Sequence, residues 1–140
     1  MKNDTKKWDQ NRHLLKSIPS PTEAAYEIKM KIPELTFEGV RGQPDFAHLY
    51  MTFYPGKKVI ELKSLKEYFF AFRSQVYSYE RIINVIYDDL MSAYSPTRLR
   101  LMMICNPRGG ISSKLTVDSD WGVRGGEDRF KDWVGQADEW

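Results

Sequence analysis

FEGVRGQPDFA, residues 37–47, separates two segments in which apolar and polar residues alternate. The segment before it covers residues 26–32, and the segment after it covers residues 47–54. Alternation with a period of two is typical of strands that bury one face, so we predict two strands here, the first ending at Pro33. The Gly-Gln-Pro-Asp sequence has the residues of a turn, and we predict residues 37–47 to be the connecting loop.

Helical spacing of apolar residues replaces this alternation in the middle of the chain. A short apolar piece, Val59-Ile60, first predicts the start of another strand. We then predict a helix whose N-cap is Ser64, and a second helix over residues 78–92. On the second helix the residues expected on the apolar face are Ile82, Ile83, Ile86 and Leu90, and those expected on the solvent face are Arg81, Asp88 and Asp89.

Two more alternating segments, residues 99–105 and 111–117, follow the helices and are separated by Asn-Pro-Arg-Gly-Gly. The predicted order is therefore β-β-α-α-β-β. This order indicates an α+β domain over residues 23–117, with an antiparallel sheet that carries two helices on one face. The other face of such a sheet needs cover, which favours a homo-oligomer.

The two ends of the chain differ from this domain in composition. Residues 1–22 are polar and include two prolines near their end, so we predict an N-terminal arm. Residues 118–140 form a C-terminal tail that mixes charges and glycines with large aromatic residues. These aromatic residues are Trp121, Phe130, Trp133 and Trp140. We expect the tail to dock on the domain or on a neighbouring subunit.

The composition of the 140 residues argues against several classes of protein. Lys plus Arg number 21 and Asp plus Glu 19, so no strong basic field indicates direct binding of nucleic acid. With one cysteine and two histidines, a cysteine and histidine metal site is not expected. No stretch reaches the length of a membrane span, and the N-terminus lacks the apolar run of a signal peptide. We therefore expect a cytoplasmic protein without a membrane partner.

Four short stretches together resemble one family. They are Gly42-Gln43-Pro44-Asp45-Phe46-Ala47, Glu61-Leu62-Lys63-Ser64-Leu65-Lys66, Glu80 at the start of the second predicted helix, and Pro107-Arg108-Gly109-Gly110-Ile111. In this order they resemble QueF, the NADPH-dependent 7-cyano-7-deazaguanine reductase of queuosine biosynthesis, a pathway of tRNA modification. The resemblance implies the tunnelling fold, or T-fold, whose subunits form ring-shaped barrels. It also implies a homo-oligomer, most simply a decamer of two stacked rings.

The resemblance assigns roles to particular residues. In the family a cysteine thiolate attacks the nitrile carbon, NADPH is the reductant and an aspartate, here Asp45, supplies protons. A glutamate that follows a histidine holds the purine edge, and this pair reads Tyr79-Glu80 here. The other residues implied to line the substrate pocket are Ile60, Glu61 and Leu62. The residues implied to lie on the NADPH side are Lys63, Ser64, Lys66 and Arg108.

The nucleophile is the point at which this chain departs from the family. Members have Ser-Leu-Cys-Pro ahead of the GQPDFA motif, whereas this chain has Thr-Phe-Glu-Gly, and counting back from Gly42 puts Glu38 at the cysteine position. A carboxylate is a poor substitute for a thiolate, which ionises near neutral pH and is strongly nucleophilic. The one cysteine, Cys105, lies on the apolar face of a predicted strand, so we expect it to be buried and unreactive.

Three functions stay open from the sequence. The first is a 7-cyano-7-deazaguanine reductase of the QueF type, with NADPH as cofactor and with activity reduced by the missing thiol. The second is an enzyme of the same fold that binds a purine or pterin and uses Glu38 and Asp45 as an acid and base pair, as a cyclohydrolase would. The third is a non-catalytic oligomer that binds such a small molecule.

Overall fold

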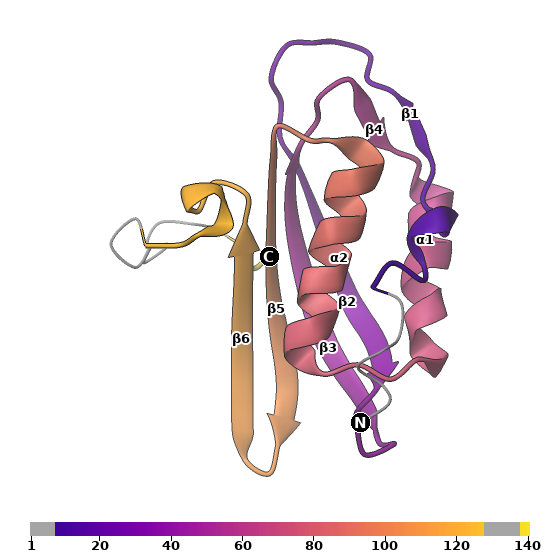
Figure 1. Ribbon diagram of the computed structural model, residues 1–140, viewed down its shortest axis with the longest axis vertical. Coiled ribbons are helices and arrows are strands. Elements are labelled where there is room, and N and C mark those ends of the chain that lie inside the picture. Colours follow the sequence, from indigo (N-terminus) through magenta and orange to yellow (C-terminus); the bar gives the residue numbers. More distant parts are fainter. Residues whose placement is uncertain (1–7, 128–137) are drawn as a thin grey trace.

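The computed structural model describes residues 8–127 and 138–140, and its largest unit is a four-stranded antiparallel sheet. The strands lie in the order β2 (Ile28–Glu38), β3 (Pro44–Tyr54), β5 (Arg98–Arg108) and β6 (Ile111–Asp118). Two helices, α1 (Leu62–Ala71) and α2 (Tyr79–Tyr94), cover one face of this sheet (Figure 1). The predicted order β-β-α-α-β-β is therefore confirmed for the main sheet and its helices.

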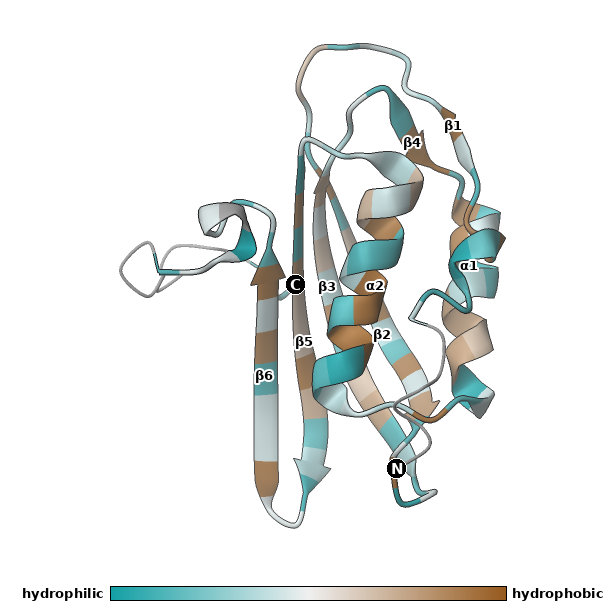
Figure 2. Cartoon of the chain, viewed as in Figure 1, coloured by the Kyte–Doolittle hydropathy of each residue, from teal (hydrophilic) through white to brown (hydrophobic). Residues whose placement is uncertain are grey.

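The core lies between the sheet and the helices. Hydrophobic residues alternate with polar ones along the strands (Figure 2), and the buried residues of α2 are mostly hydrophobic. The buried apolar residues of β3 are Ala47, Leu49, Met51 and Phe53. The predicted apolar face of α2 is also buried, and it consists of Ile82, Ile83, Ile86 and Leu90. Removing these side chains from water is the main contribution to the stability of the fold.

The hairpin of β2 and β3 is longer than we predicted. The first strand does not end at Pro33 but continues to Glu38, and a shift in register between Ile32 and Leu35 accommodates the proline. Because β2 lies at the edge of the sheet, the missing N–H of Pro33 costs no bond to a neighbouring strand. Residues 37–47 are therefore not a loop, since only residues 39–43 lie between the two strands.

The prediction that Ser64 caps the first helix is wrong. Glu61 is the N-cap of α1, and its carboxylate accepts hydrogen bonds from the backbone N–H groups of Ser64 at 2.8 Å and Lys63 at 3.3 Å. The bond from Ser64 is the main cause that lowers the pKa of Glu61, so the side chain stays ionised at the positive end of the helix. In α2 the N-cap is Ser78, which accepts from the backbone N–H of Arg81 at 3.1 Å.

The prediction that Asp89 faces solvent is also wrong. This residue of α2 is fully buried and accepts hydrogen bonds from the hydroxyl of Tyr68 at 2.6 Å and from Nε of Arg12 at 2.8 Å. Burial raises the pKa of Asp89 above its ordinary value, against the effect of both partners. Because Arg12 comes from the N-terminal segment, this ion pair ties that segment to the helical layer.

The described part of the predicted arm packs on the domain. It contains the short helix η2 (Arg12–Leu14) and β1 (Ser17–Pro19), which pairs with β4 (Lys58–Ile60) in a separate two-stranded sheet. The apolar piece Val59-Ile60 therefore pairs with the N-terminal segment and not with the main sheet. Asn11 and Gln75 exchange two amide hydrogen bonds of 2.7 and 2.9 Å, so the segment also holds the chain just before α2.

The sheet face that the helices leave open carries a buried charge cluster. Arg100 of β5 is 2% exposed and forms ion pairs with Asp118 at 3.4 Å and Asp138 at 2.8 Å. The amine of Lys31 donates to the backbone carbonyl of Trp140 at 2.5 Å. The described end of the tail therefore docks on the domain, whereas Phe130 and Trp133, two of its predicted docking residues, lie outside the described residues.

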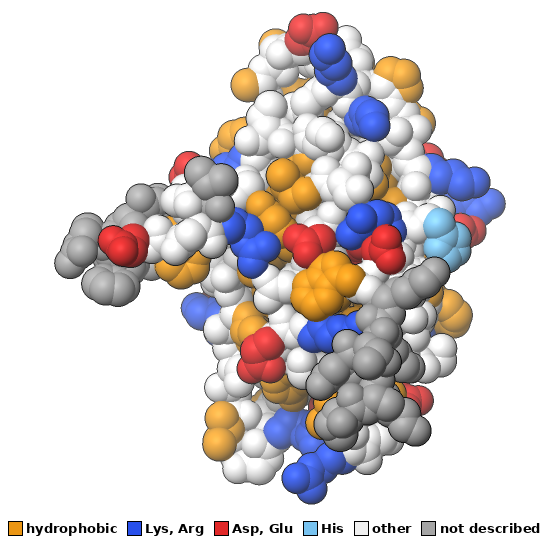
Figure 3. All heavy atoms as spheres, viewed as in Figure 1, with side chains coloured by type: hydrophobic (Ala, Val, Ile, Leu, Met, Phe, Trp, Pro, Cys, Tyr) orange, Lys and Arg blue, Asp and Glu red, His pale blue; other side chains and the backbone are white. Residues whose placement is uncertain are grey.

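The surface shows no large field of one charge on the face that carries the helices, where acidic and basic side chains are interspersed (Figure 3). The large apolar side chains that are exposed are found in several parts of the described structure: Trp8, Ile18, Val40, Phe46, Leu62, Phe70, Ile111 and Trp140. Among the described residues, no helix has the length and apolar character needed to cross a membrane.

Candidate active site

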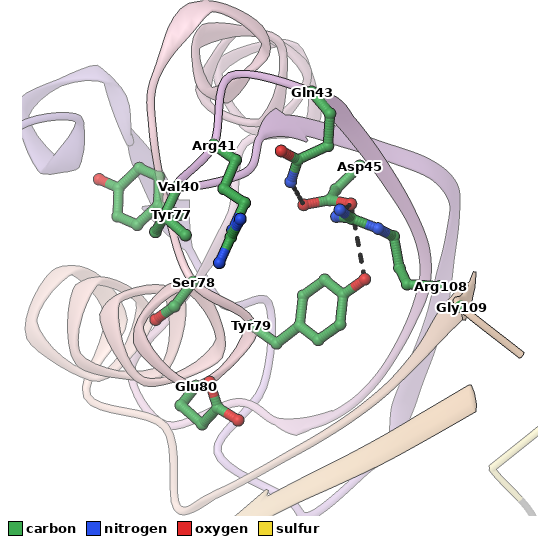
Figure 4. A pocket seen from close by; sticks show the side chains of 10 residues that line it. All are labelled: Val40, Arg41, Gln43, Asp45, Tyr77, Ser78, Tyr79, Glu80, Arg108 and Gly109. Atoms are coloured by element: carbon green, nitrogen blue, oxygen red, sulfur yellow. Dashed lines mark hydrogen bonds and ion pairs between the residues drawn. The ribbon is translucent and has the colours of Figure 1, made fainter. Parts of the chain in front are cut away.

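A cavity of about 470 Å³ opens where three parts of the chain meet. These parts are the end of the β2–β3 hairpin, the start of α2 and the end of β5 with the turn that follows it (Figure 4). The residues that line it are Val40, Arg41, Gln43, Asp45, Tyr77, Ser78, Tyr79, Glu80, Arg108 and Gly109. Four residues with roles implied by the sequence, Asp45, Tyr79, Glu80 and Arg108, are therefore brought together.

Asp45 is the most connected of these side chains. It is 4% exposed and forms an ion pair with Arg108 at 2.5 Å. Its carboxylate also accepts from the amide of Gln43 at 3.3 Å and from the hydroxyl of Tyr79 at 3.5 Å. The bond from Arg108 to Asp45 is the main cause that raises the pKa of this arginine, so the guanidinium stays charged near neutral pH.

The short connection of residues 39–43 sets the position of Gln43. Gly39 donates from its backbone N–H to the carbonyl of Gln43 at 2.7 Å, and Gly42 donates to the carbonyl of Gly39 at 2.8 Å. Gly42 has a φ of 84°, which favours glycine. A Cβ at Gly39 would overlap the amide of Gln43 and lie 2.5 Å from Oδ2 of Asp45, so a side chain at this position would force these two side chains to move.

The start of α2 supplies the other wall. Tyr79 follows the N-cap and points its hydroxyl at Asp45, while Glu80 lies one residue further along at the opening of the cavity (Figure 4). Burial, and then the charge of Asp45, raises the pKa of Tyr79, so its hydroxyl keeps its proton and acts as a donor near neutral pH. Glu80 is exposed and leaves a carboxylate available to a ligand with hydrogen-bond donors.

Glu38 is not paired with Asp45. In the hairpin register Asp45 lies opposite Phe37, while Glu38 lies opposite Pro44. Because successive residues of a strand point to opposite faces, Asp45 shares the face of the buried Phe37 and Glu38 points to the other face. The backbone of Glu38 is fixed, since it accepts from the N–H of Tyr77 and donates to the carbonyl of Gln75, both at 2.9 Å. The predicted acid and base pair is therefore not formed within this chain.

The remaining candidates lie away from the cavity. Ile60 ends β4, Glu61 caps α1 and Leu62 begins it, and none of the three lines the cavity. Figure 1 shows the start of α1 well apart from the β2–β3 connection. The side chain of Glu61 caps the helix, and that of Ser64 is buried and bonds to the backbone of Lys16. Lys63 and Lys66 are exposed on α1. Within one chain these residues do not meet Glu80.

Cys105 is buried behind the cavity, on the β5 face that also carries Leu101 and Met103. Burial is the main cause, followed by the charges of Asp45 and Glu80, that raises the pKa of Cys105 to about 11. The thiol is therefore protonated near neutral pH and lacks the nucleophilic form.

We expect native Cys105 to resist alkylation by iodoacetamide at pH 8 and to react quickly after unfolding in guanidinium. Because its folded pKa of about 11 exceeds the ordinary value of 9.0, the thiol favours the folded state below about pH 9, and that contribution is lost as pH rises toward 11. Mass spectrometry of native and unfolded samples measures both rates. Equal rates at pH 8 would contradict the buried, protonated thiol.

Six lining residues were not predicted from the sequence as site residues: Val40, Arg41, Gln43, Tyr77, Ser78 and Gly109. Gln43 is part of the GQPDFA motif, and that motif is the sequence signal that marks it. No local sequence pattern marks Arg41 or Tyr77 as a site residue. Arg41 lines the cavity because of the conformation of the short β2–β3 connection, and Tyr77 lines it because residues 75–78 run beside β2. In the described part of the chain, no group of three or more His, Cys, Asp or Glu side chains is arranged to hold a metal ion.

Comparison with known proteins finds a matching family model and similar proteins. A family model described as QueF-like protein matches residues 44–124. The NADPH-dependent 7-cyano-7-deazaguanine reductase of Nitrosospira multiformis is 43% identical over 106 residues, which are 74% of this chain and 76% of that protein. A protein of the same name from Prochlorococcus marinus is 44% identical over 95 residues, which are 67% of this chain and 70% of that protein.

A solved structure shares the fold. The crystal structure of the archaeosine synthase QueF-Like in the apo form matches with a TM-score of 0.56 and covers 69% of this chain and 94% of that chain. At 10% sequence identity the likeness concerns the fold alone. The predicted fold class is confirmed by this likeness and by the antiparallel sheet with its two helices.

Proposed function

Because the chain belongs to the QueF family, we propose that it binds a 7-deazaguanine, or a closely related purine or pterin, in the cavity beside the start of α2. The observation that carries this proposal is the meeting of Asp45, Glu80 and Arg108, from three separate elements, around one cavity. A carboxylate accepts two hydrogen bonds from the ring N–H and exocyclic amine of a guanine-like edge. Glu80 is the free carboxylate of the cavity that can do so.

Glu80→Gln is expected to weaken binding of 7-cyano-7-deazaguanine about 10- to 100-fold, because the amide turns a donor toward the donors of the ligand and leaves polar groups unpaired at a cost of about 1–3 kcal/mol. Titration calorimetry of the two proteins measures the change. Glu67→Gln is the matched control, since Glu67 is exposed on α1 away from the cavity. Equal affinity of Glu80→Gln and the parent would make Glu80 a helix-start acid without a role in binding.

Reduction of the nitrile by this chain is proposed to be very slow. The covalent route needs a thiolate, position 38 carries a carboxylate and the thiol of Cys105 is buried and protonated. The relatives are named as NADPH-dependent reductases. Because this chain lacks their nucleophile, we propose that it binds the ligand but reduces it very slowly. A single incubation with 7-cyano-7-deazaguanine and NADPH tests both, by ligand binding and by NADPH oxidation.

NADPH is the proposed cofactor, and a second cavity offers residues that suit it. A groove of about 660 Å³ between α1 and β2 combines cationic side chains with aromatic rings. The cations that line it are Lys29, Lys31, Lys66 and Arg73, and the aromatic residues are Phe69, Phe70 and Trp140. Cations suit phosphate groups and rings suit the bases, whereas Ser64 is buried and does not fit this role. When bound, NADPH supplies hydride.

We further propose that the complete site forms between copies of this chain in a homo-oligomer, most simply a decamer. Within one chain the start of α1 lies apart from the start of α2, and residues 60–62 do not line the cavity, so another copy would have to bring such a segment to it (Figure 1). Two of the exposed apolar residues lie at these places, Leu62 at the start of α1 and Val40 in the β2–β3 connection. Exposed apolar residues of this kind are typical of subunit contacts.

We expect light scattering at micromolar concentration to report a mass several times 16.4 kDa. Leu62→Glu is expected to reduce that mass, because it places a charge in the contact, and to weaken ligand binding in parallel. Lys57→Glu, in the exposed turn before β4, is the control. A monomer of 16.4 kDa that binds 7-cyano-7-deazaguanine with full affinity would contradict a shared site.

Acid and base chemistry by Glu38 and Asp45 is the weaker alternative. Hairpin register puts their side chains on opposite faces, and Arg108 already neutralises Asp45. The cavity is better suited to hold a ligand than to exchange protons between these two carboxylates.

A further inference from the structure

The charges that line the cavity do not all cancel within the chain. Arg108 and Asp45 form an ion pair, which leaves one carboxylate, Glu80, and one guanidinium, Arg41. In the described part of the chain, no carboxylate lies within ion-pair distance of Arg41. A ligand that satisfies both groups must present hydrogen-bond donors to Glu80 and an acceptor, preferably an anion, to Arg41.

Arg41 is held over the cavity by a well-defined backbone. Two bonds fix the connection that carries it, from Gly39 to Gln43 at 2.7 Å and from Gly42 to Gly39 at 2.8 Å. The side chain extends from this connection toward the start of α2, on the same side as Ser78 and Tyr79 (Figure 4). An exposed arginine is usually free to turn into solvent, but this one lies across the cavity from Glu80.

The chemistry of the two walls favours an anion near Arg41. A guanidinium offers a planar pair of donors that matches a carboxylate or a phosphate. The N-terminus of the 16-residue helix α2 opens on the same cavity, and its positive end adds to the attraction for negative charge. A nitrile has no charge and uses neither feature fully.

We propose that the preferred ligand of this cavity is a guanine-like heterocycle that carries an anionic group, with its donor edge on Glu80 and its anion on Arg41. The inference rests on the proposed function, because it assumes that Glu80 holds a guanine-like edge. It goes further in naming Arg41 as the residue that selects among such ligands. Carboxylate and phosphate share the required chemistry, so the anion is either a carboxyl group on the ring system or a phosphate carried through a ribose.

Titration calorimetry with three probes separates these possibilities. The probes are 7-cyano-7-deazaguanine, which is neutral, 7-carboxy-7-deazaguanine and guanosine 5′-monophosphate. We expect one anionic probe to bind the parent about tenfold more tightly than the nitrile, in line with a charge-assisted hydrogen bond at a partly exposed site. Which of the two it is identifies the carboxylate or the phosphate as the anion.

Arg41→Gln is the decisive variant, and Lys57→Gln is its control because it removes one positive charge outside the cavity. We expect Arg41→Gln to lose the preference for the anionic probe while its affinity for the nitrile changes by less than about twofold, and Lys57→Gln to keep the preference. Equal affinity of the parent for all three probes, or an unchanged preference in Arg41→Gln, overturns this inference and leaves the proposed function standing. Failure of the parent to bind any probe overturns both.

Discussion

The wild-type protein is expected to oxidise NADPH with 7-cyano-7-deazaguanine at no more than a background rate, and Glu38→Cys is expected to form a covalent adduct with the nitrile. Loss of a catalytic nucleophile costs on the order of 10³- to 10⁶-fold in rate. Position 38 is the cysteine position by the count from Gly42, and its backbone is held by Gln75 and Tyr77 through two bonds of 2.9 Å. The backbone from which a thiol at position 38 would extend is therefore fixed. The side chain at this position points to the face opposite Asp45, so the expected adduct rests on the proposal that the ligand is bound between copies of the chain.

Recovery of full turnover is not expected in Glu38→Cys. Within one chain the side chain at position 38 points away from Asp45, and Arg108 neutralises that carboxylate. Intact mass spectrometry detects the thioimide as one ligand mass added to the chain, and NADPH absorbance measures turnover. Glu38→Ser is the matched control, because its hydroxyl is a much weaker nucleophile than a thiolate at neutral pH.

The same measurements offer two results that contradict this account. Rapid NADPH oxidation by the wild type would mean that a nucleophile exists elsewhere, and Cys105→Ala would then identify it or exclude it. Absence of an adduct in Glu38→Cys, with ligand binding intact, would mean that position 38 does not face the bound nitrile. Both outcomes are read from the same set of proteins.

Asp118→Ala is expected to lower the free energy of unfolding by about 3–5 kcal/mol, because removing one partner of a buried ion pair leaves an uncompensated charge. Asp118 is fully buried and pairs with Arg98 at 2.7 Å and with Arg100 at 3.4 Å. Asp138 still pairs with Arg100 in the variant, which places the expected loss toward the lower end of this range. The midpoint of thermal unfolding should fall by roughly 10 °C.

Urea unfolding at constant protein concentration measures this change, with an unchanged slope as the sign that only stability is affected. Glu23→Ala is the control, because Glu23 is exposed and its removal is expected to cost less than about 0.5 kcal/mol. A loss below 1 kcal/mol in Asp118→Ala would show that water replaces the carboxylate at Arg100. Water would then reach the open face of the sheet more readily than the burial of Asp118 and Arg100 indicates.

Sequence periodicity predicted the parts of the fold that depend on neighbouring residues. The alternation of Ala47, Leu49, Met51 and Phe53 identified a buried strand face because period two is a local property. The burial of Asp89 was missed because its partner Arg12 is 77 residues away in the sequence. The continuation of β2 past Pro33 was missed because only the position of the strand at the sheet edge makes that proline harmless.

The candidate site was predictable where a family motif contains its residues. Asp45, Glu80 and Arg108 lie in three such motifs and meet at one cavity. The predicted pair of Glu38 and Asp45 does not form, because Asp45 lies opposite Phe37 in the hairpin. A register that differed by one residue would have put Glu38 on the same face as Asp45, and the sequence alone does not set that register. Arg41 was missed because nothing in its local sequence distinguishes it from any exposed loop arginine.

Gly39 also limits how the chain can be engineered. By the count from Gly42 it falls at the place of the proline in the Ser-Leu-Cys-Pro pattern that the resemblance implies, and its N–H donates to the carbonyl of Gln43 at 2.7 Å. Proline has no N–H to donate, and its ring would meet the Gln43 amide beside Asp45. Introducing a cysteine at position 38 and a proline at position 39 therefore also requires Gln43 to move, and the effects of the two substitutions are expected to be non-additive.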